Sequence, residues 1–254
     1  MTHQAESVDL EIMEMSFAGG SWNVVYHIGI LRFLQEDSGF DLSQWQFLGA
    51  SSGCIPAVAA ACDIPWQEVK ESYDRLASNS RASRTGPMFK MSKWQNEAIS
   101  YSFNRRPHVY RKAQKRLHLC VSHFPPKSYQ LINEFESNSH LQNIMLGSFF
   151  IPFYSTQMVK HRGRLCIDGS FSNNKPTLSD RTITASAVDT SASVHPRTPY
   201  KPFSGFKPRD PSRAWKMYRE GYENAYSYFE KHSHFHFEIK KTKNSINTDS
   251  RIDL

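Results

Sequence analysis

Residues 45–62 read WQFLGASSGCIPAVAAAC, and this stretch decides the fold. It opens with a short apolar run that favours a strand and closes with eight small apolar residues that favour a helix. Between the two lies Gly49-Ala50-Ser51-Ser52-Gly53, which fits the pattern G-x-S-x-G. In that setting the pattern makes a sharp turn that needs glycine at its flanks and exposes the central serine. We therefore predict that Ser51 is a nucleophile; the alternative is an ordinary Gly/Ser turn at the start of a helix.

A unit of the same kind precedes this one. Residues 9–17 (DLEIMEMSF) alternate between apolar and polar side chains and predict a strand. The turn Ala18-Gly19-Gly20-Ser21 interrupts the alternation, and apolar residues then recur at helical spacing from Tyr26 to Leu34. Two successive units of strand, glycine-containing turn and helix are typical of a parallel sheet with helices packed on it.

The remaining elements extend this pattern. The sequence predicts helices at 65–76, 137–147 and 211–231, strands at 116–122, 129–135, 164–168 and 181–188, and an exposed loop at 195–211. We predict an α/β fold with a mostly parallel central sheet flanked by helices. A chain of 254 residues is long enough for one such domain. We expect a single domain over residues 1–231 and a polar tail over 232–254.

Several classes of protein are disfavoured by composition. No apolar run approaches the ~20 residues of a membrane-spanning helix. The first fourteen residues are acidic, whereas a secretory signal begins with basic residues. The cysteines form neither a CxxC pair nor a zinc-binding spacing, so we interpret them as reduced thiols of a cytoplasmic protein. They are Cys54, Cys62, Cys120 and Cys166.

The net charge of +7 is distributed unevenly. Residues 75–127 contain 12 basic side chains and a single acid, Glu97, and aromatic residues such as Trp94 and Tyr101 are interleaved with them. Cations and aromatic rings together favour an anionic lipid surface. The same mixture also suits nucleic acid, and a solvated loop is the simplest alternative. We interpret the segment as one that docks peripherally on an anionic membrane or lipid-droplet surface, and we expect no nucleic-acid partner.

A nucleophilic serine needs a base and an oxyanion hole. The turn at Gly19, Gly20 and Ser21 offers outward-pointing backbone N–H groups for the second purpose. It does not complete the dinucleotide pattern G-x-G-x-x-G, because Trp22, Asn23 and Val24 follow it. A phosphate-binding turn or a plain connection between strand and helix are the alternatives for this loop.

Three motifs in this order resemble those of the patatin-like phospholipases. Residues 19–22 (GGSW) followed by 25–29 (VYHIG) resemble the oxyanion loop and first helix of that family, and residues 49–53 resemble its nucleophile elbow. Asp168-Gly169-Ser170, followed by residues 172–176 (SNNKP), resembles its catalytic aspartate segment. The resemblance covers about residues 9–190. It implies a three-layer α/β/α sandwich and a serine acyl hydrolase that uses a Ser–Asp dyad without histidine, metal or cofactor.

The resemblance also implies residue roles. Ser51 is the nucleophile, Asp168 accepts its proton, and the N–H groups of Gly19, Gly20 and Ser21 stabilise the tetrahedral intermediate. The substrate is then a lipid ester, a glycerophospholipid or an acylglycerol, from which fatty acid is released. The family usually has a third glycine where this chain has Ser21. The alternative is therefore a catalytically weak or inactive patatin-like module that binds a lipid or a protein.

Other side chains offer weaker hypotheses. His195 follows Ser51 and Asp168 in the order of a Ser–Asp–His triad, and we rank this triad below the dyad. Three alternating histidines near the C-terminus, His232, His234 and His236, fit a metal site less well than a polar tail. Glu220 and Glu223 are interpreted as a solvated helix face. The sequence leaves the oligomeric state open.

Overall fold

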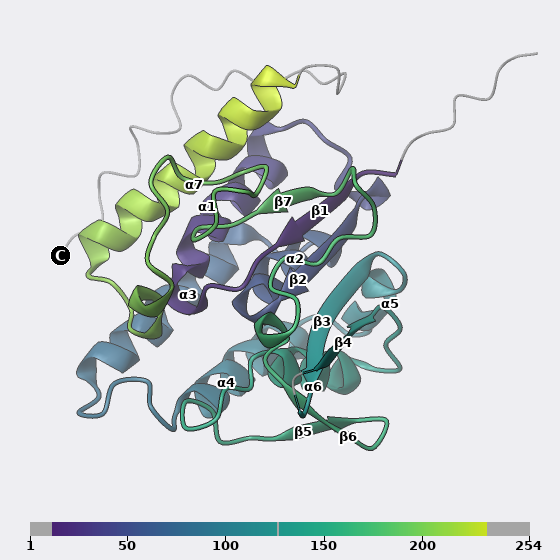
Figure 1. Ribbon diagram of the computed structural model, residues 1–254, viewed down its shortest axis with the longest axis vertical. Coiled ribbons are helices and arrows are strands. Elements are labelled where there is room, and N and C mark those ends of the chain that lie inside the picture. The colour runs from purple at the N-terminus through teal and green to yellow at the C-terminus, as the bar shows by residue number, and fades with distance from the viewer. Residues whose placement is uncertain (1–11, 126, 233–254) are drawn as a thin grey trace, which may run out of the picture.

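The computed structural model describes residues 12–125 and 127–232. Within these residues the chain forms a seven-stranded sheet flanked by helices (Figure 1), so the α/β prediction is confirmed. The strand order is β5-β6-β3-β2-β1-β7, with β4 also paired to β3. The strands are β1 (Glu14–Phe17), β2 (Gln46–Ala50), β3 (Leu117–His123), β4 (Ser128–Ile132), β5 (Val159–His161), β6 (Arg164–Ile167) and β7 (Ile183–Ala185).

The sheet is mixed. Strands β3, β2, β1 and β7 form a parallel core, as the alternation of strands and helices predicts. Strands β4, β5 and β6 pair antiparallel. The prediction of a mostly parallel sheet therefore holds for the core. Beyond it, short connections join the antiparallel pairs β3–β4 and β5–β6, whereas β6 pairs with β3 from far along the chain.

The helices are α1 (Val24–Arg32), α2 (Cys54–Ala61), α3 (Trp66–Ala82), α4 (Met91–Asn104), α5 (Val109–Ala113), α6 (Asn138–Ser148) and α7 (Pro211–Lys231). Helices α1, α2, α3, α6 and α7 lie at predicted positions, most with changed lengths, whereas α4 and α5 were not predicted. Two of these helices begin at a side-chain N-cap: Ser137 and Asp210 accept hydrogen bonds from backbone N–H groups of the first turns of α6 and α7. Helix α2 packs against β1, β2 and β3, and α6 packs against β3, β5 and β6.

Some predicted boundaries are wrong. The first strand occupies only 14–17, and residues 1–11 lie outside the described residues. The strands predicted at 129–135 and 181–188 shorten to β4 and β7. The basic segment 75–127 is not a loop: it contributes the end of α3, all of α4 and α5, and β3.

Helix α7 brings the end of the described chain back to the first helix. It crosses α1 where each helix has a glycine, since a Cβ at Gly29 would lie 1.9 Å from the carbonyl oxygen of Tyr218 and a Cβ at Gly221 would lie 1.9 Å from that of Tyr26. The backbones can approach this closely only because both residues lack a side chain. Packing against α7 thereby holds α1 in place, and α1 starts directly after the 19–23 loop.

Candidate active site

The register of the sheet brings two distant strand ends together. Residues 119 and 120 of β3 pair with both β2 and β4, and residues 122 and 123 pair with both β4 and β6. A strand has two edges, so β2 and β6 share the edge opposite β4. Strand β2 runs parallel to β3 and ends opposite Cys120, whereas β6 runs antiparallel and ends opposite Ser122. The residues that follow them, Ser51 and Asp168, therefore meet.

The turn after β2 is as tight as its sequence predicts. A Cβ at Gly49 would lie 2.6 Å from the carbonyl oxygen of Gly53, and a Cβ at Gly53 would lie 2.1 Å from that of Phe17. Ser51 itself has a φ of +50°, a left-handed conformation that is costly for a residue with a side chain. Its N–H donates to Ser148 Oγ at 2.9 Å, which helps to hold this conformation.

The hydroxyl of Ser51 points at the carboxylate. Ser51 Oγ donates a hydrogen bond to Asp168 Oδ2 at 2.6 Å. The other carboxylate oxygen, Oδ1, accepts from the Ser170 N–H at 2.8 Å, and the Asp168 N–H donates to the Phe150 carbonyl at 2.9 Å. Asp168 is only 2% exposed. The carboxylate is thus held in one orientation, with one oxygen reserved for the serine.

Burial changes the chemistry of this carboxyl group. Removal from water raises the pKa of Asp168 to about 6, against the opposing effect of the hydrogen bonds from Ser51 and Ser170. At neutral pH the group is ionised, so it can accept a proton. A pKa nearer to neutrality also makes it a stronger base than an exposed aspartate.

Two of the three predicted oxyanion donors are engaged with side chains. The Gly19 N–H donates to Asn174 Oδ1 at 2.9 Å, and the Gly20 N–H donates to Ser52 Oγ at 3.1 Å. Ser21 has a φ of +53°, and its N–H has no acceptor within the described part of the chain. The loop therefore presents one unengaged donor and a second whose acceptor is a rotatable hydroxyl.

A later segment supports this loop. The 3₁₀ helix Pro202–Phe206 packs on it so closely that a Cβ at Gly205 would lie 2.4 Å from the carbonyl oxygen of Gly20. Arg209 donates to Asn23 Oδ1 at 3.2 Å. This contact was not predictable, because nothing local in the predicted loop 195–211 indicates which surface it covers.

Tyr154 ties the same region together. Its hydroxyl accepts from Trp22 Nε1 at 2.7 Å and donates to the carbonyl of Phe206 at 3.2 Å. The tyrosine therefore links the residue after the predicted oxyanion donors to the 3₁₀ helix that covers them.

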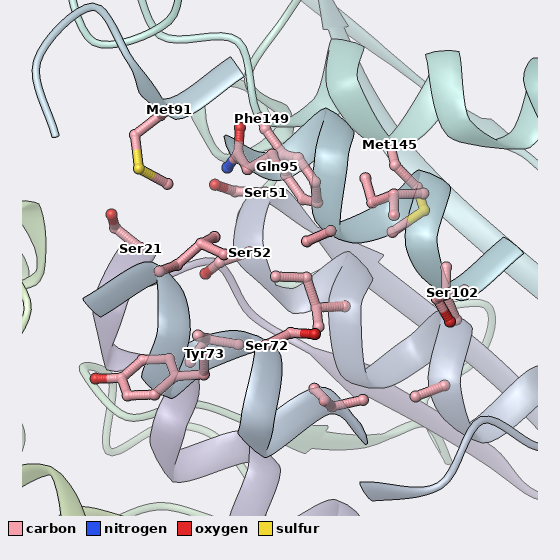
Figure 2. Close-up of a pocket in the computed structure, with 18 of the residues that line it drawn as sticks. Ser21, Ser51, Ser52, Ser72, Tyr73, Met91, Gln95, Ser102, Met145 and Phe149 are labelled. Carbon is pink, nitrogen blue, oxygen red and sulfur yellow. The ribbon is translucent and has the colours of Figure 1, made fainter. Parts of the chain in front are cut away.

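Ser51 and Asp168 line a largely apolar pocket of about 140 Å³ (Figure 2). In this view Ser51 and Ser21 lie at one end of the pocket, and Ser72 and Ser102 lie toward the other. The walls come from α1, α2, α3, α4, α6 and the residues beside them, and their apolar members include Val24, Ile28, Ile55, Val58, Ile64, Val69, Leu76, Met91, Ile99, Phe103, Met145 and Phe149. Such a cavity suits an apolar chain whose polar end reaches Ser51.

The alternative residues are placed elsewhere. Val194 forms a β-bridge to the outer edge of β7, so the neighbouring His195 lies at that end of the sheet. Strands β7 and β1 therefore separate His195 from Ser51 and Asp168, which follow β2 and β6. His195 Nδ1 contacts the Pro196 carbonyl. His232 Nδ1 contacts the Tyr228 carbonyl, and the other two predicted histidines of the tail lie outside the described residues. Glu220 is not simply solvated, since it accepts a hydrogen bond from the Tyr200 hydroxyl.

Much of the positive charge of the basic segment serves the fold. Arg106 forms a bidentate pair with Glu68, at 2.8 and 3.0 Å. Arg116 donates to three backbone carbonyls, and Lys112 pairs with Asp63 at 2.7 Å. The interpretation of residues 75–127 as a lipid-docking segment stays a prediction, and Arg106, Arg116 and Lys112 are engaged within the fold.

Residues 12–125 and 127–232 offer no candidate for a membrane-spanning helix or for a metal site. No helix there combines the length and the apolar character needed to cross a bilayer. No group of three or more His, Cys, Asp or Glu side chains in the same residues is arranged to hold a metal ion.

Two further polar residues contribute to the site without having been assigned a role from the sequence. Ser148, at the end of α6, accepts from the Ser51 N–H and donates to the Cys120 carbonyl at 2.7 Å. Asn174 contacts Gly19 across 155 positions of sequence. Asn174 belongs to the segment that resembles the family motif, but Ser148 resembles any serine at a helix end, and only the tertiary contact reveals it.

Comparison with known proteins identifies a family and several relatives. Residues 15–180 match the model of the family described as patatin-like phospholipase. The chain is 28% identical to 1-acylglycerol-3-phosphate O-acyltransferase Pnpla3 of Mus musculus over 173 residues, which are 66% of this chain and 41% of that protein. It is 25% identical to patatin-like phospholipase domain-containing protein 2 of Rattus norvegicus over 189 residues, which are 72% of this chain and 39% of that protein.

The chain therefore spans about two fifths of the length of these curated relatives. Among solved structures, VipD from Legionella pneumophila superposes with a TM-score of 0.58 at 10% identity, covering 87% of this chain and 67% of that one. A likeness at this identity shows the fold alone.

Proposed function

This chain belongs to the patatin-like phospholipase family, and from that premise we propose that it is a serine acyl hydrolase that releases fatty acid from a glycerophospholipid or an acylglycerol. The observation that carries the proposal is the hydrogen bond of 2.6 Å between Ser51 Oγ and Asp168 Oδ2, at one end of an apolar pocket. We assign the activity to residues 1–231, acting as one catalytic domain in the cytoplasm with reversible contact to a lipid surface.

The reaction begins with the dyad. Asp168 takes the hydroxyl proton while Ser51 Oγ attacks the ester carbonyl carbon, which gives a tetrahedral oxyanion. The intermediate collapses, the bond to the alcohol oxygen breaks, and the proton on Asp168 passes to that oxygen. Water then attacks the acyl-enzyme, again giving its proton to Asp168. The acid is released as the proton returns to Ser51 Oγ, so the enzyme is regenerated.

The oxyanion requires donors that are in place before the reaction. The Ser21 N–H is unengaged, and the Gly20 N–H becomes available if the Ser52 hydroxyl rotates away. Loss of one such donor typically costs about 3 kcal/mol of transition-state stabilisation. The start of α2 directly after residues 51–53 adds a helix N-terminus, whose positive end favours negative charge near Ser51.

A second function is favoured by the same loop. The Gly19 and Gly20 N–H groups both donate hydrogen bonds to side chains, so in this conformation they are not free to stabilise an oxyanion. This arrangement favours a pocket that holds a lipid without turnover. The chain would then be a lipid- or protein-binding module of the family. A third outcome is acyl transfer, since one relative is named as an acyltransferase of 1-acylglycerol-3-phosphate; an acceptor alcohol would replace water in the second step.

Covalent labelling tests the proposal. A fluorophosphonate probe should label the wild type on Ser51, and Ser51→Ala should abolish both labelling and fatty-acid release from phospholipid vesicles. Ser72→Ala, which changes a serine elsewhere in the same pocket, is the matched control and should keep both. Equal fatty-acid release by wild type and Ser51→Ala would refute the hydrolase. A wild type that binds lipid but takes no label would favour the binding module, and product appearing only with added 1-acylglycerol-3-phosphate would favour transfer.

A further inference from the structure

Four large apolar side chains are exposed on two segments of the fold. Met88 and Phe89 are 39% and 57% exposed, and Phe153 and Met158 are 74% and 65% exposed. We refer to these four residues as the apolar rim. Single exposed apolar residues are ordinary, but a group of them on neighbouring segments marks an interaction surface.

The two segments of the apolar rim are joined by hydrogen bonds. Ser92 Oγ, in the first turn of α4, accepts from the Thr156 N–H at 3.0 Å and from the Gln157 N–H at 3.2 Å. Figure 1 shows the chain before β5 passing beside α4. The two segments that carry the apolar rim therefore lie next to each other.

The same two segments also form the wall of the catalytic pocket. Met91, two positions after Phe89, lines the pocket, and so do Ile151 and Tyr154, on either side of the 152–153 tip. In Figure 2, Met91 lies toward the end of the pocket that holds Ser51, away from Ser102. The apolar rim thus adjoins the end of the pocket at which the ester bond must be placed.

The backbone at the two phenylalanines is unusual. Phe89 has a φ of +61° and Phe153 has a φ of +67°. A bulky residue with positive φ is an outlier, and glycine or asparagine is the ordinary occupant of such a position. Both phenylalanines also leave their rings in water instead of the core. Stability of the fold therefore does not account for these rings.

The charge around the apolar rim selects the partner. Arg84 has no acidic partner within the described residues, and Lys90 donates only to the neutral Ser83 hydroxyl, at 2.7 Å. Lys93 is 3.9 Å from Glu97, and both side chains are well exposed. Cations beside apolar side chains suit an anionic lipid layer. Two of the four members of the apolar rim are methionines, which offer no ring on which a nucleobase could stack.

We propose that the apolar rim, together with Arg84, Lys90 and Lys93, is the surface that docks this chain on an anionic lipid layer. The four apolar side chains enter the layer, and the three cations face its headgroups. Docking in this orientation places the Ser51 end of the pocket against the lipid, so an ester can enter without crossing water. This last consequence depends on the proposed hydrolase function, but the docking does not.

Vesicle binding tests the surface without turnover. The chain with Ser51→Ala is mixed with vesicles of phosphatidylcholine alone, or of phosphatidylcholine with phosphatidylserine, and the bound fraction is measured by flotation. Adding Phe89→Gly or Phe153→Gly should lower the partition coefficient about tenfold or more on both vesicles, since a buried aromatic side chain is lost. Adding Arg84→Gln or Lys90→Gln should lower it about fivefold on the anionic vesicles only, an effect that salt should erase.

Matched controls lie at the opposite end of the parallel strands. Leu178, 39% exposed like Met88, precedes Ser179, whose hydroxyl contacts Glu14 at the start of β1. Lys115 precedes β3, and Lys231 follows Phe229, which packs on Trp45 just before β2. The variants Leu178→Ser, Lys115→Gln and Lys231→Gln should bind vesicles like the parent.

The glycine variants also separate docking from misfolding. Glycine is unstrained at positive φ, so Phe89→Gly and Phe153→Gly should not lower the melting temperature. Unchanged vesicle binding in both would overturn the proposal, as would equal loss in the controls. An oligonucleotide that displaces the chain from vesicles, and that binds through Arg84 and Lys90 more tightly than lipid does, would overturn the proposal in favour of a nucleic-acid partner. A separate outcome is that the chain with Ser51 intact hydrolyses no ester while its Phe89→Gly and Phe153→Gly variants lose vesicle binding. That result would support the docking surface and refute only the hydrolase function.

Discussion

Replacing Asp168 by asparagine is expected to stabilise the fold above pH 6 while it abolishes acyl hydrolysis. The carboxylate is fully enclosed, and burial holds its pKa at about 6, against an ordinary value near 3.9 for an aspartate in an unfolded chain. The folded state therefore binds more protons than the unfolded state between these two values. As a result, the free energy of unfolding of the wild type falls as the pH rises through that window.

The magnitude follows from the size of the shift. A difference of about 2 pH units corresponds to about 3 kcal/mol, at 1.36 kcal/mol per unit. Asparagine keeps an oxygen that can accept a hydrogen bond from Ser51 or Ser170. Because it carries no charge at any pH, the variant does not bear the free-energy cost of burying a carboxylate. For a chain of this length, about 3 kcal/mol corresponds to a rise in melting temperature of roughly 6–12 °C. Below about pH 4 the wild-type carboxyl is protonated in both states, and the difference should disappear.

The assay is a series of thermal and urea melts of wild type and Asp168→Asn from pH 4 to 8, with fluorophosphonate labelling as the measure of activity. A stability difference that is the same at pH 4.5 and pH 8 would refute the argument that burial of charge at Asp168 is costly. A variant that is less stable than wild type at pH 8 would refute it as well.

Asp189 is the matched control because its pKa is shifted in the opposite direction. The hydrogen bond from Lys175 and those from Ser191 lower the pKa of Asp189 to about 2. Its contribution to stability is therefore present above about pH 4 and is lost as the pH falls toward 2. Asp189→Asn should reduce stability at neutral pH, and only slightly, since the carboxylate is 43% exposed and solvent screens the pair.

Three further predictions concern activity and the support of the site. The rate of acyl-enzyme formation should fall about tenfold per pH unit below pH 6, as Asp168 becomes protonated, and a rate that is flat down to pH 5 would exclude Asp168 as the base. Gly205→Ala should lower kcat about 100-fold with little change in KM, because its Cβ displaces the Gly20 carbonyl and with it the loop, and an unchanged kcat in steady-state assays would contradict this. Ser148→Ala should lower the free energy of unfolding by about 1–3 kcal/mol in urea, because the Ser51 N–H and the Cys120 carbonyl lose their partner; a change below about 0.5 kcal/mol would show that other groups satisfy them.

Local patterns were reliable where a single physical cause decides the conformation. The strand–turn–helix around Ser51 was predictable because Gly49 and Gly53 have no room for a Cβ. Helix α7 was predictable in both boundaries, since Asp210 caps it and its apolar residues recur at helical spacing. Lengths of strands were less predictable, because a strand ends where its neighbour ends, and β7 pairs over only three residues.

The basic segment shows where composition fails. Its charge is evident in the sequence, but the use of each cation depends on what the fold brings near it. Arg106 faces Glu68 across 38 positions, and Arg116 faces carbonyls of the 42–61 region, whereas Arg84 and Lys90 remain beside the apolar rim. The same residue type therefore serves the core in one place and an external surface in another.

By itself, the sequence determined the α/β class and the positions of the Gly-rich turns, because these depend on side-chain size and spacing within a few residues of chain. The resemblance of three motifs then identified Ser51 and Asp168 as partners. The tertiary structure decided that these two residues, 117 positions apart, meet at 2.6 Å, because β2 and β6 end against the same edge of β3. It also decided which donors of the 19–21 loop are engaged and which exposed side chains border the pocket, since both depend on contacts between segments that local sequence does not encode.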